Sequence, residues 1–306
     1  MYVLILYHKE FRHNNNKEKA VSKPKVLYLT NKELLAEINR SKITFCYFVD
    51  DQYKNYDMIV QSLDEITPEK IREAKEKIST RLYAEERQRQ KDAGVKAHKI
   101  KVEEIDPEAI PTSEIVWRVV TYEHIPLAEG RVKNPKSTAD LHVKLNFIPF
   151  KHYIIGDEGQ FIEVGRSHWK DGLSNGSFEL HGGRITDRLA RMFIKLVERY
   201  AQKNNWRSYT YNEEMRGQAL LQLSHVGLLF DENRSDNPFA YYTRVVTNAF
   251  TRILNVEKKN QVIRDDILVM NGASPSMTRQ VEDAMSQNQK VMPVIKIDIS
   301  EGNKGS

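Results

Sequence analysis

The stretch that decides the fold reads Asn237-Pro-Phe-Ala-Tyr-Tyr-Thr-Arg-Val-Val-Thr-Asn-Ala-Phe-Thr-Arg-Ile-Leu254. Asn237 can cap a helix, and Pro238 fits the first helical position, where its missing N–H is not needed. At about 100° per residue the stretch predicts an amphipathic helix that continues to Lys259. Its apolar stripe is Tyr242, Val245, Val246, Ala249, Phe250 and Ile253, and its opposite face holds Tyr241, Arg244, Asn248, Thr251, Arg252 and Asn255.

The polar face of this helix combines an aromatic ring, two guanidinium groups and amides without an acidic residue. Such a mixture suits phosphates, base edges and unstacked bases. Basic outer faces are also common on solvated helices, so the composition alone leaves an ordinary surface as the alternative.

Two further amphipathic helices precede this stretch. Asn212 can cap a helix that runs to Phe230, with Glu213 and Glu214 in its first turn, where the helix dipole favours acids. Thr186 can cap the other helix, whose apolar residues recur every three or four positions. Together the three helices predict an all-α second domain. The buried positions are Met215, Ala219, Leu220, Leu223, Val226 and Phe230 in one helix, and Leu189, Met192, Phe193, Leu196, Val197 and Tyr200 in the other.

The chain of 306 residues is long enough for two domains. Its net charge of +5 and pI of about 9.0 favour an acidic partner such as nucleic acid. Between positions 184 and 207 seven basic residues face only Asp187 and Glu198. This basic cluster consists of Arg184, Arg188, Arg191, Lys195, Arg199, Lys203 and Arg207.

A single cysteine, Cys46, excludes an internal disulfide framework and a cysteine-based zinc site. Its neighbours predict a buried strand at 43–49 and an inert thiol. No apolar run is long enough to cross a bilayer, and the start lacks the features of a signal peptide. We therefore expect a soluble, cytoplasmic protein without a membrane partner.

Residues 1–175 predict a mixed α/β region. Thr30 and Glu33 form a capping box for a short helix, and Thr67-Pro68 begins a long charged helix that ends near Asp92. A linker is expected at 93–112. The expected strands are 1–7, 43–49, 115–122, 141–155 and 160–164, the last two joined by a hairpin turn at 156–159.

The C-terminal part, 261–306, predicts a helical hairpin and an apolar tail. Helices at 261–270 and 274–285 flank Gly272 and could be a helix-turn-helix, but acids on both helices favour a packing hairpin. The tail 291–299 is either a partner-binding strand or a strand docked on its own domain.

Catalytic signatures are weak throughout. The nine histidines lack metal-binding spacing, and neither a phosphate-binding loop nor a nucleophile elbow occurs, so we expect no metal, no cofactor and no catalytic residue. An enzyme hidden in residues 1–175 is the remotest alternative.

Several motifs resemble a known family. Leu220-Leu-Gln-Leu-Ser-His-Val-Gly-Leu228 is similar to the Leu-Ile-Gln-Glu-Gly-x-Ile-Gly-Leu helix with which bacterial sigma factors hold the polymerase clamp helices. Residues 186–261 resemble region 2 of those factors, most closely the shortened late-transcription sigma factors of T-even-like tailed phages. The other motifs shared with the phage factors are Asn31-Lys-Glu-Leu-Leu35, Phe230-Asp-Glu232, Asn237-Pro-Phe-Ala-Tyr-Tyr-Thr243, Asn248-Ala-Phe250 and Glu257-Lys-Lys259.

This resemblance implies a fold and a function. The expected fold is α+β: a mixed α/β domain of unknown role (1–175), a sigma region-2-like helical domain (176–260) and the C-terminal hairpin. The expected partners are host core RNA polymerase, through its clamp helices, and promoter DNA with an AT-rich element to be melted. The implied polymerase contacts are Leu221, Gln222, His225 and Val226, and the implied DNA contacts are Phe239, Tyr241, Tyr242, Arg244, Asn248, Thr251, Arg252, Lys258 and Lys259. For Phe239 the alternative is a packing contact at the start of the helix.

Two departures and one disagreement accompany the resemblance. Val245 and Val246 stand where primary sigma factors carry a Trp pair, and little chain follows the helix, so a phage co-activator is expected to help. Motif alignment selects Tyr242 as the base-stacking ring, whereas the helical wheel favours Tyr241. The rival hypothesis is a host polymerase-binding regulator that does not recognise promoter DNA.

Overall fold

The computed structural model describes residues 29–95, 100–103 and 105–291. Among them the α+β class is confirmed. The helices are α1 (Asn31–Ile43), α2 (Pro68–Asp92), α3 (Asp187–Ala201), α4 (Asn212–Val226), α5 (Pro238–Met270) and α6 (Met277–Val291). The strands are β1 (Cys46–Phe48), β2 (Met58–Val60), β3 (Trp117–Val120), β4 (Phe150–Ile155), β5 (Phe161–Ser167), β6 (Trp169–Lys170) and β7 (Ser177–Phe178). Short 3-10 helices are η1 (Asp51–Lys54), η2 (Leu63–Glu65), η4 (Pro107–Ala109), η5 (Thr112–Glu114), η6 (Thr138–Asp140) and η7 (Gly227–Leu229).

The described strands form a five-stranded sheet in the order β1-β5-β4-β3-β2, beside a small β6-β7 pair. Only β2 and β3 run parallel, with Met58 opposite Trp117, and the other neighbours are antiparallel. The predicted hairpin is confirmed, because the backbone N–H of Gly156 donates to the carbonyl of Gln160 at 2.8 Å and Ile155 pairs with Phe161. Helix α2, capped by Thr67 as predicted, packs its Ala74 and Ile78 on the β2–β3 side of the sheet.

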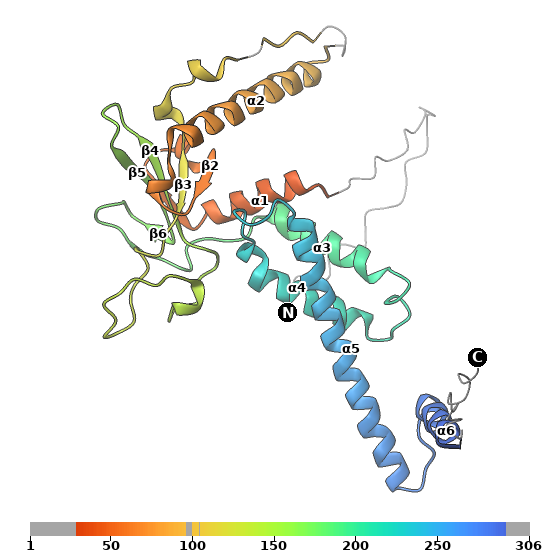
Figure 1. Ribbon diagram of the computed structural model, residues 1–306. Coiled ribbons are helices and arrows are strands. Elements are labelled where there is room, and N and C mark those ends of the chain that lie inside the picture. The colour runs from red at the N-terminus through yellow and green to blue at the C-terminus, as the bar shows by residue number, and fades with distance from the viewer. Residues whose placement is uncertain (1–28, 96–99, 104, 292–306) are drawn as a thin grey trace, which may run out of the picture.

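Helices α3, α4 and α5 enclose a second core on the other side of α1 (Figure 1). Thr186 caps α3 as predicted, and all six apolar residues predicted to be buried in that helix are buried. Helix α1, with its predicted capping box, contributes Leu34 and Ile38 to this core, and the sheet side contributes Phe147 and Phe150. The helical core therefore extends across the predicted boundary at residue 175.

Several local predictions are wrong. Asn212 is not a cap: it is the first residue of α4, and its amide donates to the carbonyls of Ala201 and Trp206 at 3.2 and 2.9 Å. The strand expected at 141–155 begins only at Phe150, because Leu145 and Phe147 fill the core from a loop. The start of the strand expected at 43–49 is helical, since α1 ends at Ile43. Cys46 is only half-buried, although burial raises the pKa of its thiol to about 12.

The segment expected to be a linker and the predicted helix break also differ from expectation. Ile105 and Ile110 pack against α2, and the Ser79 hydroxyl donates to the carbonyl of Ile105 at 2.5 Å, so part of 93–112 belongs to the sheet core. Helix α5 continues without a break to Met270, because no glycine or proline interrupts it. The strand expected at 1–7 lies outside the described residues, as does the tail beyond Val291.

The two halves meet at α1 through two buried cations. Lys42 donates from Nζ to both carboxylate oxygens of Glu232, at 2.7 and 2.6 Å, and to the carbonyl of Phe230 at 2.8 Å. Arg118 of β3 donates to the side-chain oxygen of Asn39 at 2.7 Å. Burial lowers the pKa of both cations, so these contacts must offset a desolvation cost.

We expect Lys42→Met to lower the free energy of unfolding by about 3 kcal/mol, because Glu232 and the carbonyl of Phe230 would lose a buried donor. Adding Glu232→Leu to this variant should restore more than half of the loss. Urea unfolding followed by circular dichroism measures both. A double variant as unstable as the single one would contradict this account.

A second prediction concerns pH. His124 and His168 flank the hydroxyl of Ser167, at 3.4 and 3.3 Å, and burial lowers the pKa of each to about 3. The unfolded chain, with histidine pKa values of about 6.5, binds more protons between these limits. The free energy of unfolding should therefore fall as the pH drops from about 6.5 toward 3.

The variant His124→Gln/His168→Asn should reduce this fall between neutral pH and mildly acidic pH. His142→Gln is the matched control, because His142 is exposed, and it should leave the pH dependence unchanged. Thermal melting over a pH series measures the pH dependence of stability. Equal dependence in the unmodified chain, the double variant and the control would argue against the buried histidines as the cause.

Candidate functional site

The N-terminal half of α5 is fixed firmly in the helical core. Asn237 caps the helix by accepting from the backbone N–H of Ala240 at 3.0 Å, with Pro238 at the first position as predicted. Tyr242 and Val246 are fully buried, and the ring of Tyr242 meets that of Phe193 edge-on at 4.8 Å. The opposite face of the helix is therefore held in one orientation toward solvent.

That outer face carries most of the predicted DNA contacts. Arg244, Asn248, Thr251, Arg252, Lys258 and Lys259 are all exposed. No acidic residue occurs between Pro238 and Val256, and within the described part of the chain neither Arg244 nor Arg252 forms an ion pair. A hollow of about 430 Å³ brings four of these residues together with two others on α5; it is lined by Asn248, Thr251, Arg252, Asn255, Val256 and Lys259.

The two tyrosines do not lie free on this face. Tyr242 is buried, as the helical wheel predicted, and its hydroxyl donates to the carbonyl of Gly227 at 2.7 Å. Tyr241 is half-buried, and its hydroxyl donates to the carbonyl of Val226 at 3.0 Å. Both hydroxyls thus satisfy carbonyls at the C-terminal end of α4, which a helix leaves unpaired. Burial raises the pKa of both phenols.

Phe239 is the exposed ring at the start of α5, with 42% of its surface accessible. It lines a hollow of about 190 Å³ between α3 and α5, together with Leu29, Leu196, Arg199, Tyr200, Lys203 and Thr243. Lys203 lies over the Tyr200 ring at 4.3 Å, and the buried hydroxyl of Thr243 has no partner among the described residues. Arg199 and Lys203 belong to the basic cluster recognised in the sequence, but they were not predicted as part of the site; their four-residue spacing along and just beyond α3 was the available signal.

The predicted polymerase contacts lie on α4. Leu221 is 49% exposed and His225 is exposed, whereas Gln222 and Val226 are partly buried. The buried side of the same helix holds Met215, Ala219 and Leu223. An apolar side chain on an otherwise polar exposed face is a suitable anchor for another protein.

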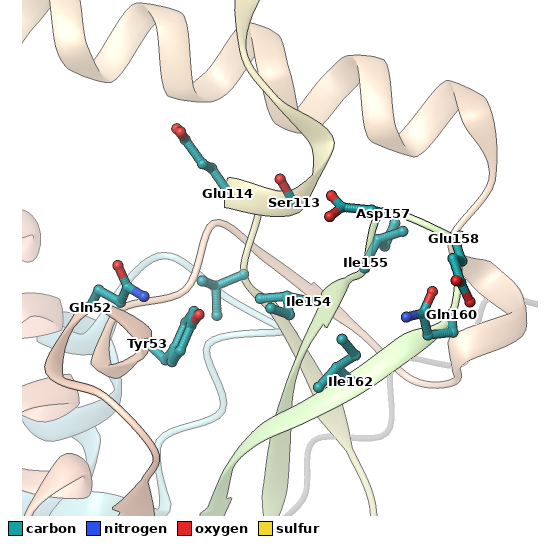
Figure 2. Close-up of a pocket in the computed structure, with 12 residues that line it drawn as sticks. Gln52, Tyr53, Ser113, Glu114, Ile154, Ile155, Asp157, Glu158, Gln160 and Ile162 are labelled. Atoms are coloured by element: carbon teal, nitrogen blue, oxygen red, sulfur yellow. The ribbon is translucent and has the colours of Figure 1, made fainter.

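A separate hollow of about 730 Å³ lies on the sheet side, beside the hairpin of β4 and β5 (Figure 2). Isoleucines of β4 and β5 form its floor, and its charged lining residues are Glu114, Asp157 and Glu158. Without a cation in its lining, this hollow does not suit a phosphate-bearing ligand. Elsewhere in the described ranges, no group of three or more His, Cys, Asp or Glu side chains is placed to hold a metal ion.

Comparison of the chain with models of known protein families, with curated proteins and with solved structures gave no significant match in any of the three. No helix in the described part of the chain is long and apolar enough to cross a membrane.

The rings of Tyr242 and Phe239 differ in burial, and this difference gives a test. Tyr242→Ala should lower the free energy of unfolding by about 3–5 kcal/mol, because it empties a buried aromatic site. Phe239→Ala should cost less than about 1 kcal/mol, since much of that ring is already in water. Chemical denaturation of the two variants measures this, and a reversed order would show that the rings had been assigned to the wrong faces.

Proposed function

We propose that this chain is a phage-encoded sigma factor. It directs the host core RNA polymerase to phage promoters and helps to melt an AT-rich element upstream of the start site, in the cytoplasm of the infected cell. The observation that carries the proposal is the acid-free outer face of α5, on which Arg244 is exposed and Arg252 lines a hollow together with Asn248, Thr251 and Lys259. Guanidinium groups, amides and lysines in this arrangement suit phosphates and base edges.

Helix α4 supplies the polymerase contact in this proposal. Leu221 and His225 would meet the clamp helices of the largest subunit, with Leu221 as the apolar anchor. Because α4 and α5 share one core and the two tyrosines bridge them, docking of α4 would also orient the outer face of α5. One rigid unit would then hold the polymerase on one side and DNA on the other.

Strand separation requires a partner for unstacked bases. Phe239, exposed beside Lys203, is the ring best placed to receive one, and base–aromatic stacking contributes about 1–3 kcal/mol. The burial of Tyr242 argues against this role for that ring, and Tyr241 is half-buried. Val246 is buried and Val245 half-buried, so neither can prop an opened duplex, and a phage co-activator would assist melting.

The second candidate is a regulator that binds host polymerase without reading promoter DNA. The engagement of both tyrosine hydroxyls with the end of α4 favours it, because it leaves α5 with few free rings. The two candidates differ in their need for Arg244 and Arg252, since only the first uses them.

Purified host core polymerase, the full chain and phage DNA should together produce transcripts that start at discrete sites. Arg244→Ala/Arg252→Ala should abolish these transcripts while leaving polymerase binding intact, and it should reduce the salt dependence of DNA binding by the complex by roughly two phosphate contacts. Leu221→Glu/Gln222→Ala should release the polymerase. Transcript mapping and co-sedimentation measure these effects.

The control Arg87→Ala/Lys91→Ala removes two exposed cations from α2 and should leave transcription unchanged. Transcription that is insensitive to Arg244 and Arg252 would reject the sigma-factor proposal. Loss of polymerase transcription from all templates on adding the chain would favour the regulator instead.

A further inference from the structure

The apolar stripe of α5 continues past the helical core, and no other described residue covers this continuation. Its core half contains Tyr242, Val246, Ala249 and Ile253, at alternating steps of four and three residues. The same series continues with Val256, Asn260, Ile263, Ile267 and Met270. In this second half Val256, Ile263, Ile267 and Met270 are 45%, 56%, 53% and 85% exposed. This spacing is that of a coiled-coil seam.

Helix α6 does not cover this exposed seam. The turn between the helices is held through Asp265, which accepts from the backbone N–H and hydroxyl of Ser276 at 2.8 and 2.7 Å. At about 100° per residue, Asp265 lies on the side of α5 opposite Ile263. Figure 1 shows this half of α5 extending away from the other helices, with α6 near its far end. The seam therefore faces solvent among the described residues.

Charged residues flank the seam in a self-complementary order. Glu257 and Arg264 lie on one flank, and Lys259 and Asp266 lie on the other. If two copies of α5 pair antiparallel about an axis between positions 261 and 262, Glu257 faces Arg264 of the second copy. Lys259 then faces Asp266 of the second copy, a carboxylate that also pairs with Arg279 of its own α6, and symmetry repeats each contact.

A parallel pair fits less well. It would set Lys259 beside Arg264 of the second copy, and like charges at these positions repel. A parallel pair would also bring the two helical cores together at one end of the dimer. At that end the stripe of each α5 is already covered by its own α3 and α4.

The antiparallel register also matches the length of the exposed seam. It places Val256 opposite Ile267 and Met270 opposite Ile253 of the second copy. The paired helix thus ends at Met270, where α5 ends, just as it reaches the core of the other copy. Asn260 lies in the seam, but its amide already donates to the Glu257 carboxylate at 3.0 Å, so it does not enter the interface unsatisfied.

We infer that two copies of this chain form a symmetric antiparallel dimer along positions 253–270 of α5. The inference does not depend on the proposed function. If both hold, the dimer engages Lys259, one of the proposed DNA contacts, so dimer formation and promoter binding compete for that side chain.

Sedimentation of the full chain at increasing concentration should show a monomer converting to a dimer. Ile263→Asp should keep the chain monomeric without unfolding it, because that side chain is exposed. Met285→Asp, on the exposed part of α6, is the matched control and should leave the dissociation constant unchanged. Thermal melts of each variant check that the fold is retained.

Charge reversal tests the register. Arg264→Glu should raise the dissociation constant roughly tenfold or more, because the substitution, present in both copies, converts two attractive contacts of the dimer into repulsive ones. Adding Glu257→Arg should restore it to near the original value. A double reversal that does not restore association would overturn the proposed register.

Crosslinking tests the direction of pairing in a Cys46→Ser background. A mixture of chains carrying Asn260→Cys and Ile263→Cys separately should crosslink between the two kinds of chain. Crosslinking of either kind with itself alone would instead show parallel helices and overturn the inference.

Two further outcomes would also overturn it. One is a chain that stays monomeric at every concentration. The other is a monomeric full chain that dimerises only when residues 292–306 are deleted, since the tail would then be the occupant of the seam. Because these measurements contain neither polymerase nor DNA, their failure is distinct from failure of the proposed function.

Discussion

The ammonium group of Lys42 is held by three oxygen atoms in a place that water scarcely reaches. Two belong to Glu232 and one to Phe230, so the last turn of α1 is bound to the connection between α4 and α5. A buried cation without such partners would cost several kcal/mol, so an arrangement that separates them is strongly disfavoured. Through this contact the first described helix determines where α5 begins.

The position of α5 then determines which of its side chains can act. Two neighbouring tyrosines point toward the end of α4 and bond to its carbonyls, so the helix presents guanidinium and amide groups outward rather than phenol rings. The exposed aromatic ring is instead that of Phe239, one turn earlier, which lies beside Arg199 and Lys203. The proposed nucleic-acid interface would therefore draw on two helices, although the sequence motif lies on one.

Local signals predicted much of the fold. The caps at Thr30, Thr67, Thr186 and Asn237 and the hairpin at 156–159 each depend on a few adjacent residues, and all are found. Other features depend on distant contacts. The hydroxyls of Tyr241 and Tyr242 bond to carbonyls fifteen residues earlier, and the strand expected at 141–155 begins late because the loop containing Phe147 is fixed by a core to which α1 and α3 also contribute. Periodicity cannot detect such partners, so it identified the outer face of α5 but not the hollow around Phe239.

The unbroken course of α5 from the cap to Met270 has a geometric consequence. Arg252 and Met270 are separated by eighteen residues, or about 27 Å of helix. Whatever attaches at the far end is therefore held at a set distance and angular phase from the arginine. Lengthening the helix by one residue would advance its end by only about 1.5 Å but rotate it by about 100°. During evolution, α5 should therefore tolerate side-chain substitutions far better than insertions or deletions.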